Sequence, residues 1–79
     1  NELNLIGCRA DEALSRLDKF LDDAFLSGVL TVRIIHGSGM GILRKAVAEF
    51  LKSHPQVSRS ETAPSNQGGG GVTIATLSD

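Results

Sequence analysis

The segment Ile35–Gly41 contains residue types that could hold an anion and transfer a proton, and its sequence is IHGSGMG. Glycine permits positive φ angles and lets a ligand approach the backbone, so the N–H groups of such a loop can surround a phosphate. A turn that binds nothing would use glycines in the same way. We assign phosphate binding to the small residues of the loop, Gly37, Ser38, Gly39 and Gly41.

His36 is the candidate for proton transfer in this segment. An imidazole changes its protonation state near neutral pH, so it can act as a general acid or base toward a phosphodiester. The alternative is a structural histidine whose ring nitrogens hold the glycine loop in place. Ser38 is expected to be a bystander rather than a nucleophile, because no base neighbours it in the sequence.

Three basic residues could assist the loop. Arg44 and Lys45 begin the helix that is expected after it, where they could neutralise phosphates, and Arg9 follows the first expected strand. On a solvated helix face the same side chains would have no ligand. The charge pattern favours an anion here, because residues 29–59 contain five basic residues and one acidic residue in a chain of formal net charge −1.

Hydrophobic periodicity predicts four strands and two helices around the loop. The strands are predicted over residues 2–6, 31–35, 57–61 and 72–77, and the helices over residues 10–26 and 41–53. Gly28 ends the first helix. His54 ends the second, because a residue before proline avoids helical dihedral angles. The segment 62–71 ends in four consecutive glycines and is predicted to be a mobile loop without regular structure.

The element order β-α-β-α-β-β predicts an α/β fold with a mixed four-stranded sheet. Right-handed crossovers would place the parallel strands side by side and both helices on one face, which makes a two-layer sandwich with one face open to solvent. The last strand would run antiparallel to the third, its predecessor in the chain. Ligands of such sheets gather at the carboxyl ends of the parallel strands, where the glycine loop and residues 7–9 would lie.

Composition limits the function classes. A chain of 79 residues corresponds to one small domain, 1–79, and its single cysteine, Cys8, excludes an internal disulfide and favours a reducing cytoplasm. No apolar run is long enough to span a membrane. The three phenylalanines fall on apolar helix positions, and Met40 is interpreted as a packing residue. Without an exposed aromatic platform, we expect recognition of a nucleic-acid backbone rather than stacking on bases.

Two motifs at one edge of the predicted sheet resemble the small MutS-related (Smr) domain. They are Leu3–Gly7, with sequence LNLIG, and His36–Gly39, with sequence HGSG. The segments Val32–Gly37 and Gly41–Val47 are most similar to the Smr domain that ends the bacterial second-type MutS paralogues, which are MutS-like endonucleases. This resemblance covers essentially the whole chain.

The resemblance implies nucleic-acid processing. Smr domains nick DNA by phosphodiester hydrolysis, some cleave RNA, and in these paralogues the domain is the C-terminal piece of a longer, homodimeric protein with an ATPase. The implied partners are branched or double-stranded DNA, in repair and recombination, and structured RNA or the stalled ribosome. No membrane is implied.

The first motif departs from the family pattern, which has an aspartate and, two residues later, a histidine or arginine. Asn4 and Ile6 stand at these positions. The resemblance therefore assigns Asn4 to the catalytic site, but its amide cannot act as a base. The sequence offers no carboxylate cluster for Mg²⁺ or Mn²⁺, so no metal ligand is assigned and the cofactor stays open between these ions and none.

These observations leave two main hypotheses. In the first, the domain is an endonuclease in which His36 transfers a proton while the loop and its basic neighbours hold phosphates. In the second, it is a DNA-, RNA- or ribosome-binding module that lost catalysis with the first-motif aspartate. A nucleotide pocket is disfavoured, because the glycine run lacks the lysine and hydroxyl residue that end a nucleotide-binding loop.

Overall fold

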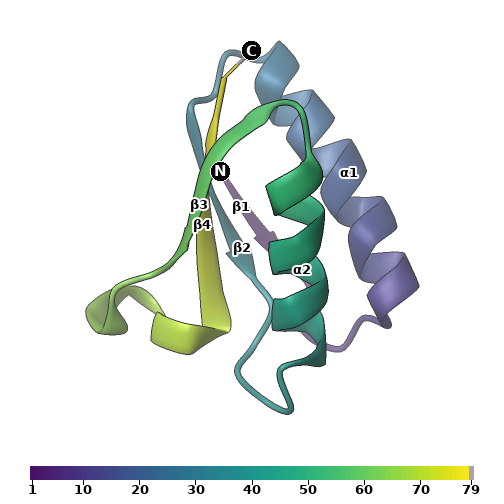
Figure 1. Ribbon diagram of the computed structural model, residues 1–79, viewed down its shortest axis with the longest axis vertical. Helices are drawn as coiled ribbons and strands as arrows, with labels where there is room; N and C mark the ends of the chain where they lie inside the picture. Colours follow the sequence, from purple (N-terminus) through teal and green to yellow (C-terminus); the bar gives the residue numbers. More distant parts are fainter. Residues whose placement is uncertain (79) are drawn as a thin grey trace.

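All the helices and strands predicted from the sequence are present in the computed structural model, which describes residues 1–78 (Figure 1). They are the strands β1 (Glu2–Asn4), β2 (Thr31–Ile35), β3 (Val57–Thr62) and β4 (Val72–Leu77), the helices α1 (Ala10–Leu26) and α2 (Ile42–Ser53), and two short 3₁₀ helices, η1 (Ser65–Gln67) and η2 (Gly69–Gly71). No helix among these residues is both long and apolar enough to cross a membrane.

The strand order is β1-β2-β4-β3, with β1 parallel to β2 and β4 antiparallel to both of its neighbours. The predicted antiparallel course of the last strand is therefore confirmed. The expectation that all parallel strands lie side by side is wrong for β3, because β4 is inserted between β2 and β3. Burial explains this order: most of β4 is buried, which suits a central strand, whereas β3 is exposed along almost its whole length and lies at an edge.

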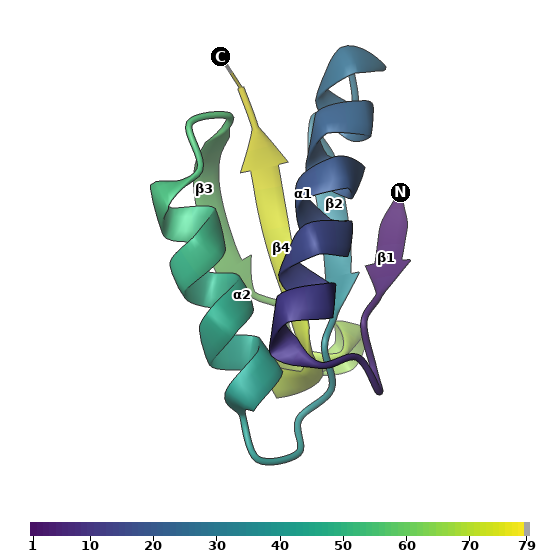
Figure 2. The same ribbon diagram turned by 90° about the vertical axis from the view of Figure 1, so that its right-hand side faces the viewer.

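Both helices cover the same face of the sheet, as predicted (Figure 2). Side-chain alternation explains this packing. On β2, Val32 and Ile34 are buried toward the helices while Arg33 points to the other face, where its Nε lies 3.3 Å from Glu2 Oε2. On α1, apolar residues recur at spacings of three and four and turn Leu17 and Leu21 inward, so that neither side chain is exposed.

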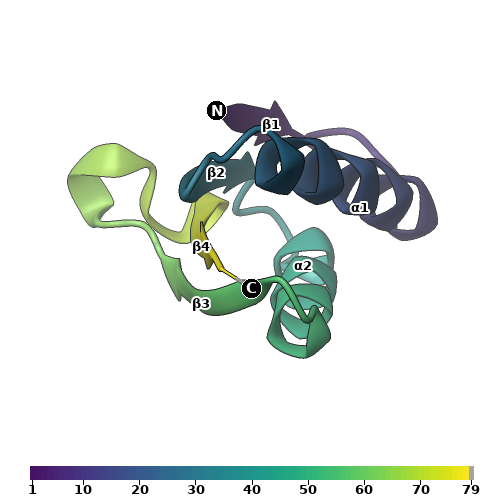
Figure 3. The same ribbon diagram turned by 90° about the horizontal axis from the view of Figure 1, so that it is seen from above.

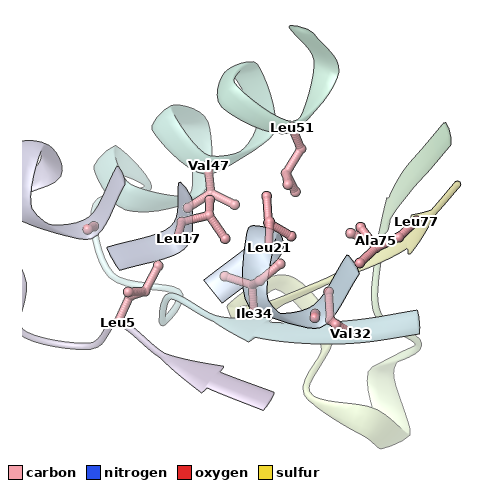
Figure 4. Close-up of a cluster of buried hydrophobic side chains, with 11 residues drawn as sticks. Leu5, Leu17, Leu21, Val32, Ile34, Val47, Leu51, Ala75 and Leu77 are labelled. Atoms are coloured by element: carbon pink, nitrogen blue, oxygen red, sulfur yellow. The ribbon is translucent and has the colours of Figure 1, made fainter. Parts of the chain in front are cut away.

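The hydrophobic core lies between the helices and the sheet (Figure 4). It combines residues from both helices and from β2 and β4, and the largest fully buried side chains are Leu5, Leu17, Leu21, Ile34, Leu51, Leu77, Val32 and Val47. The three phenylalanines pack against this core as partly buried side chains, as expected. The chain runs from β2 through the glycine loop into α2, and both elements pack on this core. The core therefore holds both ends of the loop in place.

The strand β1 is shorter than predicted, ending at Asn4 instead of residue 6. The reason is local: the Asn4 side-chain oxygen accepts a hydrogen bond of 2.9 Å from the Ile6 N–H, which turns the chain out of the extended conformation.

The prediction for segment 62–71 is also wrong in part. This connection from β3 to β4 forms η1 and η2, and it lies on the side of the sheet away from the helices (Figure 3). Pro64 O accepts the N–H groups of Gln67 and Gly69, and Gly68 O accepts that of Gly71. These internal hydrogen bonds give the glycine-rich segment a regular structure that its composition alone argued against.

Candidate functional site

The glycine loop, residues 36–41, connects the carboxyl end of β2 to the start of α2. Gly37 and Gly41 have φ angles of +81° and +80°, which explains why glycine stands at both positions. Gly41 is the N-cap of α2 and has no side chain to bond the helical N–H groups. The first hydrogen bond of the helix runs from the Lys45 N–H to Gly41 O.

Unpaired backbone donors are the main chemical feature of the loop. From Ser38 to Arg44, no backbone N–H has an acceptor within residues 1–78. This row includes the first turn of α2, where the helix dipole adds partial positive charge. Such a row of donors can bind a phosphate or another anion.

His36 lies under the loop and is 4% exposed. Its Nδ1 is 2.9 Å from Gly37 O, and its Nε2 is 2.8 Å from Thr73 Oγ1 on β4. A carbonyl oxygen only accepts hydrogen bonds, so Nδ1 is the donor, and in the neutral ring Nε2 accepts the Thr73 hydroxyl proton. Both ring nitrogens therefore hold the loop against β4, which is the structural role considered from the sequence.

The tetraglycine end of the β3–β4 connection supports the glycine loop from the other side. Gly71 O accepts the N–H groups of both His36 and Gly37, each at 3.0 Å. A β-carbon on Gly71 would lie 3.5 Å from the Gly37 carbonyl carbon and 3.6 Å from the Ser38 nitrogen. The two glycine segments thus pack backbone against backbone, with a β-carbon on Gly71 only in ordinary van der Waals contact with the loop.

Arg44 and Lys45 are exposed on the first turn of α2, as predicted. The Arg44 guanidinium bends back over the loop: its Nη2 would lie 3.2 Å from a β-carbon on Gly41, and its Nη1 lies 4.0 Å from the corresponding position on Gly70. Neither side chain has an ion-pair partner among the described residues. Two cations are therefore available beside the unpaired N–H groups.

A groove of about 500 Å³ lies between α2 and the strands β3 and β4. Arg44 and Lys45 contribute to one wall, and the hydroxyl side chains Ser60, Thr62 and Thr73 contribute to the other wall and the floor. Glu61 also borders the groove, but its carboxylate is 2.9 Å from Arg59 Nε. Cations and hydroxyl donors suit an anionic chain better than a neutral one.

The first strand and the segment after it hold the remaining candidate site residues, Asn4 and Arg9. The Asn4 oxygen is occupied by the Ile6 N–H, and Ile6 packs its side chain beside Gly37. Arg9 is the exposed N-cap residue of α1, and no hydrogen bond or ion pair joins it to the loop within residues 1–78. The start of α1 lies at the same end of the sheet as the start of α2 (Figure 2). Residues of that range form no cluster of three metal-ligating side chains, so this donor set does not fit a divalent cation.

Thr73 and Gly71 are site residues that the sequence reasoning missed. A signal for Thr73 was present, because alternation along 72–77 places it on the same face as the buried Ala75 and Leu77. A hydroxyl on an otherwise apolar face needs a buried partner. For Gly71 no local signal existed, since its role depends on contact with a loop more than thirty residues away.

Comparisons with known proteins agree with this geometry. A family model described as the Smr domain matches residues 3–78. The chain is 51% identical over 76 residues to Endonuclease MutS2 of Geobacillus sp. (strain WCH70), and 55% identical over 75 residues to Endonuclease MutS2 of Helicobacter pylori (strain 26695). These alignments cover 96% and 95% of this chain but 10% of each relative, so the chain spans about a tenth of their length.

Solved structures show the same fold. The crystal structure of the Smr domain of Thermus thermophilus MutS2 matches with a TM-score of 0.98 and 38% identity, covering 100% of this chain and 99% of that one. YdaL, a stand-alone small MutS-related protein from Escherichia coli, matches with a TM-score of 0.92 and 30% identity, covering 99% of this chain and 64% of that one.

Proposed function

Because the chain belongs to the Smr domain family, we propose that it binds the sugar–phosphate backbone of nucleic acids through its glycine loop and the first turn of α2. The observation that carries this proposal is the row of N–H groups from Ser38 to Arg44, which has no acceptor within the described chain. One phosphate accepts hydrogen bonds from this row, and the neighbouring phosphates lie along the groove between α2 and β3. The relatives are named endonucleases, which is consistent with a nucleic-acid partner.

The basic side chains would supply most of the affinity. Arg44 lies over the loop and Lys45 beside it, so each releases a counterion from the nucleic acid when it neutralises a phosphate. The glycines do not obstruct the approach of a backbone, because they carry no side chains. Arg9 is an outer contact in this proposal, reached only by a nucleic acid that extends across the sheet edge.

We further propose the context that the family resemblance implies. The domain would be the C-terminal piece of a longer, dimeric protein with an ATPase, acting in the cytoplasm on branched or double-stranded DNA in repair and recombination, or on structured RNA at the ribosome. Each of these statements concerns the longer protein, of which this chain is about a tenth.

Salt-dependent binding tests the proposed function. We expect Arg44→Ala and Lys45→Ala each to weaken binding to duplex DNA and to reduce the slope of log K against log salt concentration by about 1. Fluorescence anisotropy at several salt concentrations, with a structured RNA as a second probe, measures both quantities. The matched control is Lys19→Ala, which removes the same charge from an exposed site on α1 where Lys19 pairs with Asp23. Equal slopes for all four proteins would contradict the proposal.

Phosphodiester hydrolysis is a second candidate function, favoured by the pair of His36 and Thr73. Thr73 borders the groove, and its hydroxyl bonds an imidazole that Gly37 O orients. This is the arrangement of an activated hydroxyl. In this candidate, a water attacks phosphorus and gives its proton to the Thr73 oxygen, while the Thr73 proton passes to His36 Nε2. The same two groups then return a proton to the leaving oxygen as the phosphorus–oxygen bond breaks.

Nicking of supercoiled plasmid by the highly purified domain tests this second candidate. We expect nicking by the wild type and by Thr73→Ser. Thr73→Val should lose about 100-fold, the low end of the roughly 10²–10⁴-fold that a proton-transfer group contributes. A wild type that leaves the plasmid intact with Mg²⁺ and with Mn²⁺ would remove the candidate and leave backbone binding in place. Equal nicking by wild type and His36→Ala would remove the role of the histidine.

A further inference from the structure

Three large apolar side chains are exposed around the glycine loop, at the end of the sheet where β2 ends. Met40 is 93% exposed, Ile42 is 63% exposed and Ile6 is 61% exposed. The expectation that Met40 is a packing residue is therefore wrong. These residues form a group around the loop, because Met40 and Ile42 border one hollow with Gly37, and the Ile6 side chain lies 3.5 Å from the position of a β-carbon on Gly37. We call these three residues the apolar rim.

Met40 stands between two hollows that are lined with donors. On one side is the groove of about 500 Å³ with Arg44 and Lys45, and on the other is a hollow of about 180 Å³ formed by the curl of the glycine loop over His36. Met40 belongs to the border of both. A nucleic-acid strand with phosphates in both hollows would contact the Met40 side chain, which lines each of them.

We propose that the apolar rim, led by Met40, is a wedge that contacts the faces of bases where base stacking in a nucleic acid is interrupted. This inference rests on the proposed function, because the phosphates held by the loop bring the bases to the rim. Methionine and isoleucine are among the side chains that proteins insert between base steps. A flat, apolar base face is the part of a nucleotide that such side chains can cover, whereas phosphates and base edges require polar groups.

The charge around the apolar rim favours a nucleic acid over an apolar protein as its occupant. The rim is continuous with the unpaired N–H groups and with the cations of α2, which a hydrophobic protein surface would bury without acceptors. A nucleotide suits both parts of this surface. Its phosphate can accept the unpaired N–H groups, and its base can cover the apolar side chains beside them. With such a wedge, a loop without aromatic residues would distinguish interrupted from continuous duplexes.

Binding to paired probes tests the wedge. The probes are a continuous DNA duplex, the same duplex with a short single-stranded gap, and RNA versions of both. We expect the wild type to prefer the gapped probe, and Met40→Gln to lose about tenfold in affinity for it, as expected when an apolar contact is withdrawn. Binding of Met40→Gln to the continuous duplex should not change. Met40→Leu, which keeps an apolar side chain, should bind like the wild type. Leu30→Gln is the control, since Leu30 is 68% exposed at the opposite end of β2.

The outcomes separate the wedge from the proposed function. Loss on gapped DNA, gapped RNA or both supports the wedge and identifies the polymer. If the wild type binds with the expected salt dependence and Met40→Gln binds each probe as tightly as the wild type does, the wedge is wrong and backbone binding stands. An equal loss on gapped and continuous probes also overturns the wedge. Self-association of the wild type that disappears in Met40→Gln would make the rim an interface between copies instead. A wild type that binds no probe overturns both proposals.

Discussion

His36 connects three parts of the chain through one imidazole ring. The ring Nδ1 donates to Gly37 O in the loop, and the ring Nε2 bonds the Thr73 hydroxyl on β4. The backbone N–H of His36 donates to Gly71 O. A buried ring with two satisfied nitrogens stabilises the loop, because leaving either nitrogen unpaired would cost its desolvation. The histidine thus has a structural role whether or not it transfers a proton, and any catalytic test must allow for this.

Replacement of Thr73 measures that structural role. Thr73→Val keeps the shape of the side chain but leaves His36 Nε2 buried without a partner, so we expect the free energy of unfolding to fall by about 1–3 kcal/mol. Urea unfolding followed by circular dichroism measures the change. Thr76→Val is the matched control on the opposite face of β4, where we expect a change within about 0.5 kcal/mol. Equal losses in the two variants would show that the hydrogen bond to His36 contributes nothing to stability.

The connection between β3 and β4 is the element that differs most from its prediction. Glycine is required in it for geometry, because Gly68 has a φ of +115° and a β-carbon there would lie 2.4 Å from Val72 Cγ2. The connection ends on Gly71, whose carbonyl holds the start of the glycine loop. The connection lies on the side of the sheet away from the helices, and its last residue still fixes the position of the glycine loop that leads into α2.

Alanine at two neighbouring glycines tests this account. We expect Gly68→Ala to lower the free energy of unfolding by at least the roughly 1–2 kcal/mol that a left-handed conformation costs a residue with a β-carbon, plus the clash with Val72. Gly70→Ala should have little effect, because its β-carbon would meet only Arg44 Nη1, at 4.0 Å. Thermal unfolding of both variants gives the comparison. A Gly70→Ala variant as unstable as Gly68→Ala would contradict the proposed geometry.

In the two-layer architecture, the residues that pack the core and the residues proposed to bind a ligand lie in different parts of the domain. The core lies between the helices and the sheet (Figure 4). The loop, the groove and the apolar rim lie at the end of the sheet where β2 and β3 end and α2 begins. Basic residues concentrate in the second helix and its flanking strands, so a domain of formal net charge −1 still presents cations at this edge. If the domain binds nucleic acid as proposed, we expect its orientation to follow from this uneven charge rather than from the total charge.

The sequence by itself determined the helices and strands, the side of the sheet that the helices cover and the position of the glycine loop. These features depend on periodicity, glycine and proline over a few neighbouring residues, which is information that lies in the local sequence. The tertiary structure decided the central place of β4, the ordered connection after β3, the partner of His36 and the exposure of Met40. Thr73 is separated from His36 by 37 positions, and only the pairing of β2 with β4 brings them together. Contacts of this kind result from the folding of the whole chain, so no local pattern specifies them.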